Sequence, residues 1–165
     1  MRVVAALGRA LVVGLAACVA AGPAVAGETP ARTLEKALKA DDATRRAAAV
    51  AEAGRVGGAA PADERRRLAL VLRKVLEGDP DGSVRLVAVA SLSRLADEAA
   101  WVPVLVASIT AKDDAVRAAA TTAALTGRSD LVTVARKLLK EDQDPTFRAE
   151  VALLLGRRRR VDAVP

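Results

Sequence analysis

The sequence contains no histidine, and this absence excludes several kinds of catalytic site. Its 165 residues also include no tyrosine and only one tryptophan, one phenylalanine and one cysteine. Without histidine the chain has no imidazole for acid–base catalysis near neutral pH and no histidine ligand for a metal. No glycine-rich segment fits a phosphate-binding motif, because none is followed by Lys-Ser or Lys-Thr. We therefore expect a non-catalytic protein without a cofactor.

Pairs of neighbouring acids remain as candidates for a metal site. Calcium requires six to eight oxygen ligands, and no pair approaches that number. Each pair directly precedes a segment that we predict to be helical, where a carboxylate can cap the helix. We therefore expect these acids to be N-caps and predict no metal site; the four pairs are Asp41/Asp42, Asp79/Asp81, Asp113/Asp114 and Asp142/Asp144.

The first 26 residues resemble an export signal. Arg2 and Arg9 supply a positive start, residues 10–21 are apolar, and Ala24-Val25-Ala26 offers the small residues of a cleavage site. The apolar run is too short for a membrane-spanning helix of about 20 residues. We predict a signal peptide at 1–26, a linker at 27–30, and export to the periplasm or the medium.

The only cysteine gives this segment a second interpretation. Leu15-Ala16-Ala17-Cys18 matches the bacterial lipobox, in which the cysteine becomes the lipid-bearing first residue. The chain would then be a lipoprotein anchored at Cys18. If the segment is cleaved after Ala26 instead, the mature chain has no cysteine and no disulfide, and its stability depends on packing alone.

The basic residues are concentrated at the two ends of the chain. The formal net charge is +6, but Arg2, Arg9 and Arg157–Arg160 account for all of it, because the remaining 20 basic residues equal the 20 acidic ones. No aromatic residue interleaves with the arginines, so base stacking has no support. We expect no nucleic-acid partner.

Composition predicts an all-α fold. Alanine and leucine, which are strong helix formers, supply much of the apolar content, and Gly and Pro lie between the apolar runs. Apolar residues recur at helical spacing from residue 84 to 95. Amphipathic stretches also cover 33–39, 62–77, 98–111 and 130–141.

The chain contains four copies of a repeat that begins with an acid and an arginine. The arginines are separated by 39, 32 and 31 residues, and an Asp lies four residues before each. Each copy follows one of the amphipathic stretches, so each unit is predicted to be a helical hairpin of about 31 residues. One hairpin cannot bury its apolar face alone, whereas stacked hairpins can. The units are expected at about 31–56, 61–96, 98–127 and 129–157.

These repeats resemble the HEAT-repeat family, particularly the short HEAT-like repeats first associated with phycobilin lyases. The similarity is carried by Asp81, Val84, Arg85 and Ala88 and their counterparts around Arg117 and Arg148, and by Pro103 in a first helix. It implies a short α-solenoid over 31–157 whose second helices line the concave side. It also implies a polar ladder between units, formed by Asp42, Arg46, Asp81, Arg85, Asp113, Arg117, Asp144 and Arg148.

The ladder arginines have two interpretations. Each comes with an acid at fixed spacing, so we expect structural pairing with the acid of the same or the next unit. The alternative is a concave row that binds anions. A different surface is expected to bind a protein partner, namely the sparsely charged side of the second helices opposite the predicted core, with Leu86, Val89, Ser93, Thr121, Thr122 and Leu125.

A basic C-terminal tail is predicted at 158–165, preceded by Arg157. Its arginines, Arg157, Arg158, Arg159 and Arg160, suit a solvated helix end, or alternatively attract an anionic membrane surface. The sequence thus predicts an exported scaffold module with a protein partner. Two alternatives stay open: an envelope-surface tether that uses the tail or a lipidated Cys18, and an accessory subunit of a lyase-type enzyme.

Overall fold

The computed structural model describes residues 28–95, 97–126 and 130–162, and this part of the chain is all-helical. The predicted signal peptide and the Cys18 lipobox lie outside these residues. The predicted all-α class is confirmed. The helices are α1 (Pro30–Ala37), α2 (Ala43–Gly57), α3 (Ala62–Gly78), α4 (Gly82–Leu95), α5 (Glu98–Thr110), α6 (Asp114–Thr126), α7 (Asp130–Glu141) and α8 (Pro145–Asp162).

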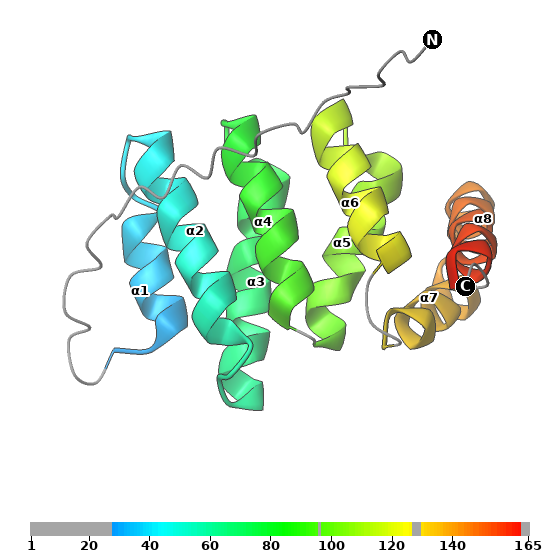
Figure 1. The fold of residues 1–165 in the computed structure, drawn as a ribbon, viewed down its shortest axis with the longest axis horizontal. Helices are drawn as coiled ribbons and strands as arrows, with labels where there is room; N and C mark the ends of the chain where they lie inside the picture. The colour runs from blue at the N-terminus through cyan, green and yellow to red at the C-terminus, as the bar shows by residue number, and fades with distance from the viewer. Residues whose placement is uncertain (1–27, 96, 127–129, 163–165) are drawn as a thin grey trace, which may run out of the picture.

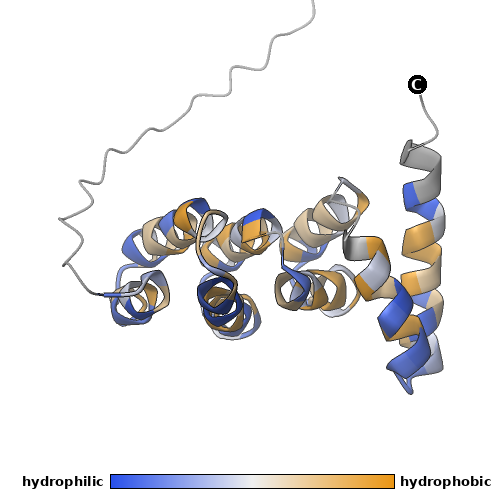
Figure 2. Ribbon diagram, turned by 90° about the horizontal axis from the view of Figure 1, so that it is seen from below, coloured by the Kyte–Doolittle hydropathy of each residue, from blue (hydrophilic) through white to orange (hydrophobic). Residues whose placement is uncertain are grey.

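The first six helices form two layers. Figure 1 shows α2, α4 and α6 side by side, and Figure 2 shows them as one row above a row of α1, α3 and α5. Helices in the row of α2, α4 and α6 contact one another more extensively than those in the other row. The last pair, α7 and α8, is turned, and α8 runs across the direction of α2, α4 and α6.

Small residues allow α2 and α4 to approach closely. A Cβ atom added at Gly54 would lie 2.6 Å from the Ser91 Cβ and 2.7 Å from its Cα. Ser91 is fully buried, and its hydroxyl donates to the Val50 carbonyl at 2.9 Å, which satisfies the one polar group in this contact. The scarcity of aromatic residues is therefore matched by a core in which backbones approach each other directly.

The core lies between the two layers. Leu68 and Leu72 of α3, Val84 and Leu92 of α4, and Trp101 of α5 are at most 1% exposed. Pro103 lies inside α5 and is buried. The core continues into the last pair through Val134, Ala135, Phe147 and Val151. The order of the helices follows the predicted stretches closely, with α3 beginning at 62, α5 at 98 and α7 at 130.

Candidate functional site

The repeated acids cap the second helix of each pair. Each of the four accepts a hydrogen bond at its Oδ1 from the backbone N–H two residues later, which is otherwise unpaired at a helix start. The lengths are 2.7 Å for Asp42, 2.8 Å for Asp81, 3.0 Å for Asp113 and 2.8 Å for Asp144. The acid therefore has a local structural role in every unit.

In three of the four acids, hydrogen bonds to the carboxylate lower its pKa and so stabilise its charged form. The pKa of Asp42 is lowered chiefly by the Thr44 N–H, and the pKa of Asp81 chiefly by the Ser83 hydroxyl. The pKa of Asp113 is lowered by the Val116 N–H and then by Arg85. Each of these carboxylates is therefore fully ionised at neutral pH and has no proton to donate as a general acid.

The repeated arginines share one contact that sequence reasoning did not predict. Each donates its Nη1 to the backbone carbonyl six residues earlier, at the end of the first helix or in the loop after it. The acceptors and distances are Ala40 at 3.0 Å, Asp79 at 2.7 Å, Ala111 at 2.6 Å and Asp142 at 2.8 Å. The arginine thereby ties the second helix of its pair to the segment that directly follows the first helix.

Ion pairs between units use only part of the predicted ladder. Arg85 donates to Asp113 of the next unit at 2.8 Å. Arg46 makes two bonds to Asp79, at 2.8 and 3.0 Å, and not to an acid of the predicted set. Arg117 pairs within its own unit with Asp114. The ladder therefore joins the first three units and ends there.

Three of the predicted ladder acids take no part in these pairs. Within the described residues, Asp42, Asp81 and Asp144 form no ion pair with any of the four arginines. The cap by itself does not prevent pairing, because Asp113 receives the Ala115 N–H at its Oδ1 and still pairs with Arg85 through its Oδ2. Asp79, which pairs with Arg46, lies two residues before Asp81 and accepts the Asp81 N–H at 2.9 Å. Asp142 lies at the same offset before Asp144 and accepts the Asp144 N–H, so this spacing of two acids was the sequence signal for the position.

The expected partner-binding residues are not all accessible. Val89 is 2% exposed, so its assignment to an open strip is wrong. Val89 lies four residues after the repeated Arg, and Val50 has the same offset in the first unit and is fully buried. At this offset the second helix faces another helix, which explains the burial of both side chains. Leu86, Ser93, Thr121 and Leu125 are half-buried, and Thr122 is exposed.

The polar members of that set bond to the backbone. The Ser93 hydroxyl donates to the Val89 carbonyl at 2.8 Å, four residues earlier. Thr121 donates to the Arg117 carbonyl at 2.8 Å and lies 3.3 Å from the Ser108 carbonyl of α5. Thr122 bonds its own helix at 3.0 Å. These hydroxyls are therefore already satisfied and add little polarity to the surface.

A different set of positions forms an uncharged surface along the second helices. The residues one and five positions after each repeated Arg in the first three units are half-buried or exposed, and none is charged. We call them the neutral strip: Ala47, Ala51, Leu86, Ala90, Ala118 and Thr122. The partner-binding set expected from the sequence contains two of its members, Leu86 and Thr122. The fixed offset from the arginine was the signal for the others.

The predicted basic tail begins inside a helix. Helix α8 runs to Asp162, so the boundary at residue 158 is wrong. Arg158 is 8% exposed, and its Nη1 donates to the Ala124 carbonyl of α6 at 3.1 Å. Arg158 therefore holds α8 against α6 and does not form part of a solvated tail, whereas Arg157 is exposed. The side chains of Arg159 and Arg160 lie outside the described residues.

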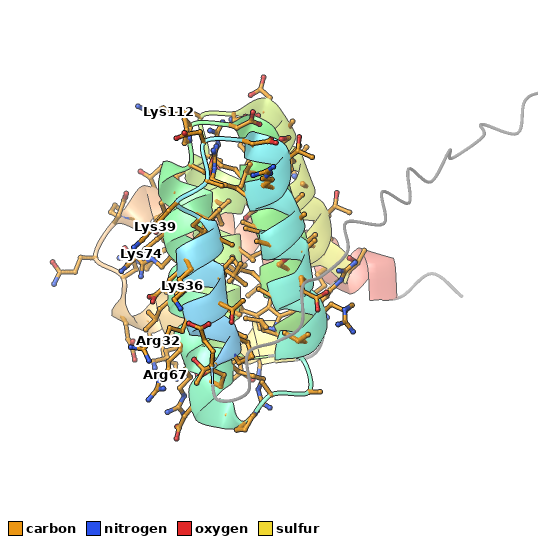
Figure 3. The ribbon with its side chains drawn as sticks, turned by 90° about the vertical axis from the view of Figure 1, so that its left-hand side faces the viewer. Arg32, Lys36, Lys39, Arg67, Lys74 and Lys112 are labelled. Atoms are coloured by element: carbon orange, nitrogen blue, oxygen red, sulfur yellow. The ribbon has the colours of Figure 1, made fainter. Side chains whose placement is uncertain are left out.

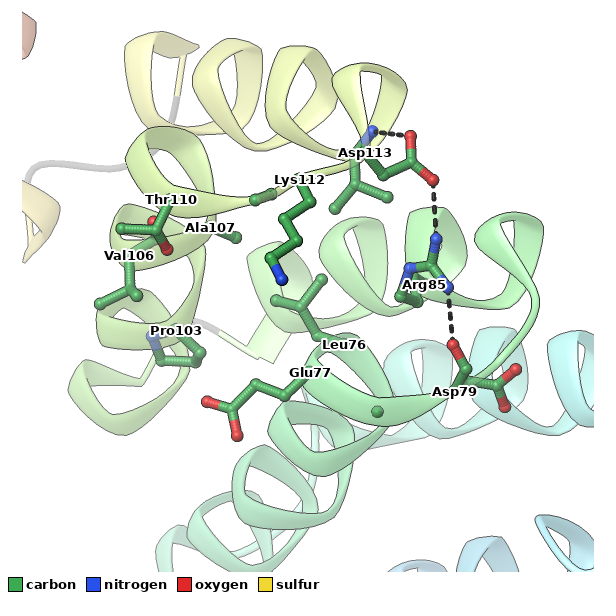
Figure 4. Close-up of a pocket in the computed structure, with 13 residues that line it drawn as sticks. Leu76, Glu77, Asp79, Arg85, Pro103, Val106, Ala107, Thr110, Lys112 and Asp113 are labelled. Atoms are coloured by element: carbon green, nitrogen blue, oxygen red, sulfur yellow. Dashed lines mark hydrogen bonds and ion pairs between the residues drawn. The ribbon is translucent and has the colours of Figure 1, made fainter.

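One hollow of about 490 Å³ opens between α3 and α5 (Figure 4). Leu76, Pro103 and Ala107 supply an apolar lining, and Figure 4 shows the Lys112 side chain extending beside Leu76. Arg85 and Asp113 lie on one wall, already bonded to each other. The hollow is therefore a contact surface that does not bring reactive groups together. The sequence did not predict this hollow.

Comparisons with protein-family models, with curated proteins and with solved structures match none of them to this chain. The described residues contain no group of three or more carboxylate, histidine or cysteine side chains that could hold a metal. Within the same ranges, no helix is both long and apolar enough to cross a membrane.

Proposed function

We propose that this chain is an exported, non-catalytic scaffold module built as a short α-solenoid of four HEAT-like hairpins. Its function is to bind a protein partner along the second helices. The observation that carries this proposal is the neutral strip, because charged residues are depleted in the central parts of protein interfaces.

The repeated hydrogen bonds support the solenoid. The same Asp cap and the same Arg-to-carbonyl bond recur in all four pairs. Repeats that share local geometry stack with a similar rotation at each step, which produces a curved array. The tighter packing among α2, α4 and α6 supports their place on the concave side.

The chemistry of the strip favours an apolar or extended segment of the partner. Ala47, Ala51, Ala90 and Ala118 are short, so a partner backbone can approach closely. Arg45, Arg55 and Arg94 lie exposed near helix ends and can provide a polar rim. The α3–α5 hollow lies on the other layer and is a separate surface.

Charge insertion tests the strip. Ala90→Glu with Thr122→Glu should reduce recovery of a partner in quantitative affinity purification at least tenfold, because a buried unpaired carboxylate is costly at an interface. Thr33→Glu with Thr110→Glu, on exposed sites of α1 and α5, is the matched control and should leave recovery unchanged. Circular dichroism should show equal helicity in both variants. Equal recovery from the two would exclude the strip as the binding surface.

The sequence alternatives remain distinguishable. An accessory role in a lyase-type enzyme predicts that loss of this chain lowers chromophore attachment in a reconstituted reaction. An envelope tether through the C-terminus loses support, since Arg158 already donates to the Ala124 carbonyl of α6. A tether through Cys18 predicts a lipid-modified N-terminus in the mature protein, whereas export with cleavage after Ala26 predicts Gly27; N-terminal mass spectrometry separates the two.

A further inference from the structure

The outward side of α3 places one exposed leucine among four cations. Leu70 is 57% exposed, the most exposed large apolar residue among those described. Arg66, Arg67, Arg73 and Lys74 lie three or four positions before and after it, so they share its side of the helix. An exposed apolar side chain surrounded by cations is typical of segments that lie at a membrane surface.

Helix α1 adds cations to the same face. Figure 3 shows Arg32, Lys36, Lys39, Arg67 and Lys74 on the α1–α3 side of the molecule. Arg32, Arg67 and Lys74 line one shallow hollow together with Leu70, and Glu35 is the one carboxylate that lines it. All three cations are exposed. The hollow therefore combines an excess of positive charge with an apolar floor.

Several of these cations are not neutralised by acids of the chain. Lys36 pairs with Glu28 at 2.5 Å, Arg73 pairs with Glu77 at 2.7 Å, and Arg67 lies 3.9 Å from Glu64. Among the described residues, by contrast, no ion pair is formed by Arg32, Lys39, Arg66 or Lys74. These four are free to meet anions from outside the chain.

We propose that the face formed by α1 and α3 docks on a bilayer that carries anionic phospholipid. In this orientation Leu70 enters the headgroup region, and Arg32, Lys39, Arg66 and Lys74 lie near lipid phosphates. The neutral strip belongs to the other layer of helices and stays open to a protein partner. The two surfaces would let the chain hold a partner at a membrane surface.

The position of the N-terminal segment favours a membrane over a soluble acidic partner. The Lys36–Glu28 pair shows that the chain joins α1 beside this face. In the lipobox alternative the chain is anchored at Cys18, which is separated from Pro30 by the eleven residues 19–29. Eleven residues reach at most about 40 Å, so a lipid on Cys18, the lipobox alternative, would hold α1 within this distance of a bilayer.

Vesicle sedimentation of the full chain tests the charge. The readout is the ratio of binding to phosphatidylglycerol-rich vesicles over binding to pure phosphatidylcholine vesicles, which removes any contribution of the N-terminal apolar run. Arg32→Gln, Arg66→Gln and Lys74→Gln together should lower the ratio on the order of 100-fold, about fivefold per charge. The control of equal charge is Arg45→Gln, Arg55→Gln and Arg94→Gln on α2 and α4, which should change it less than twofold.

A second pair of variants tests the apolar contact. Leu70→Ser should weaken binding to the anionic vesicles by roughly fivefold to tenfold. Leu153→Ser is the matched control, because Leu153 of α8 is 51% exposed and lies away from this face. Both positions are exposed, so both variants should keep the helicity of the wild type.

Three outcomes would overturn the proposal. The first is a ratio that the α1–α3 triple variant leaves unchanged, and the second is an equal loss in the α2–α4 control. The third is binding to polyglutamate or single-stranded DNA that depends on the same three cations, with no preference for anionic vesicles. That result would assign the face to a soluble acidic polymer.

Discussion

The junction between α2 and α4 and the junction between α6 and α8 connect equivalent repeats but differ in construction. At the first, Gly54 lies against Ser91, and Arg46 makes two bonds to Asp79. At the second, the helices cross, Arg117 turns to Asp114 of its own unit, and Arg158 reaches the Ala124 carbonyl. The first junction is also the more extensive.

This difference shows which part of the repeat is local and which depends on the neighbour. The Asp cap and the Arg-to-carbonyl bond need only residues of the same pair, and they occur in all four. The ion pair between units needs an acid within reach and helices that can approach closely. The positions that correspond to Gly54 and Ser91 are Leu125 in α6 and Leu154 in α8, so the same close approach is not available there.

Glycine substitutions should separate the two junctions most strongly. Gly54→Leu should lower the free energy of unfolding by about 3 kcal/mol or more, because its Cβ would overlap the Ser91 backbone. A Cβ atom added at Gly156 of α8 would have no neighbouring atom within 4 Å. Gly156→Leu should therefore be neutral or slightly stabilising, since leucine favours helix more than glycine. Urea denaturation followed by circular dichroism measures both. A similar loss from the two glycines would remove the close-packing argument.

Arginine substitutions should give a smaller and graded effect. Arg46→Met should lower the melting temperature by about 5–10 °C, because it leaves Asp79, whose side chain is 6% exposed, without its partner. Arg117→Met should lower it by less than about 3 °C, since Asp114 is 87% exposed and stays hydrated. Differential scanning calorimetry provides the comparison. If Arg117→Met were the more damaging, the ladder would not end at the third unit.

The smallest of the expected effects is in the pH dependence of stability, and it again concerns the junction between α2 and α4. Arg46 lowers the pKa of Asp79 below that of the unfolded chain. The stability from this carboxylate is therefore present above an unfolded pKa of about 3.9 and is lost as the pH falls through the folded pKa. Asp79→Asn should be less stable than wild type at pH 7, and the gap should narrow below about pH 4. Denaturant titrations across this range measure it, and a constant gap would contradict the role of the Asp79 charge.

Much of the helical fold could be predicted from the sequence, because its signals are local. The amphipathic stretches at 62–77, 98–111 and 130–141 correspond closely to α3, α5 and α7. Asp at a helix start indicates a cap whatever lies further away. Helix type and order therefore required no knowledge of the stacking.

The errors arise where a neighbouring helix decides the outcome. Val89 was assigned to the surface by projection on one isolated helix, which contains no information about the helix beside it. Arg158 looked like part of a charged tail, yet the α6 carbonyl at Ala124 lies within its reach. The pairing of Arg46 with Asp79 likewise depends on how closely two units approach, which repeat spacing alone does not specify.

Site-specific crosslinking in the cell tests the central claim, that the neutral strip is the partner-binding surface. A photo-reactive residue at position 90 replaces an exposed alanine of α4, and one at position 33 replaces an exposed threonine of α1 as the control. Position 90 should give a discrete adduct with a protein, identified by mass spectrometry, and position 33 should not. An adduct with a protein from position 33 and none from position 90 would contradict it.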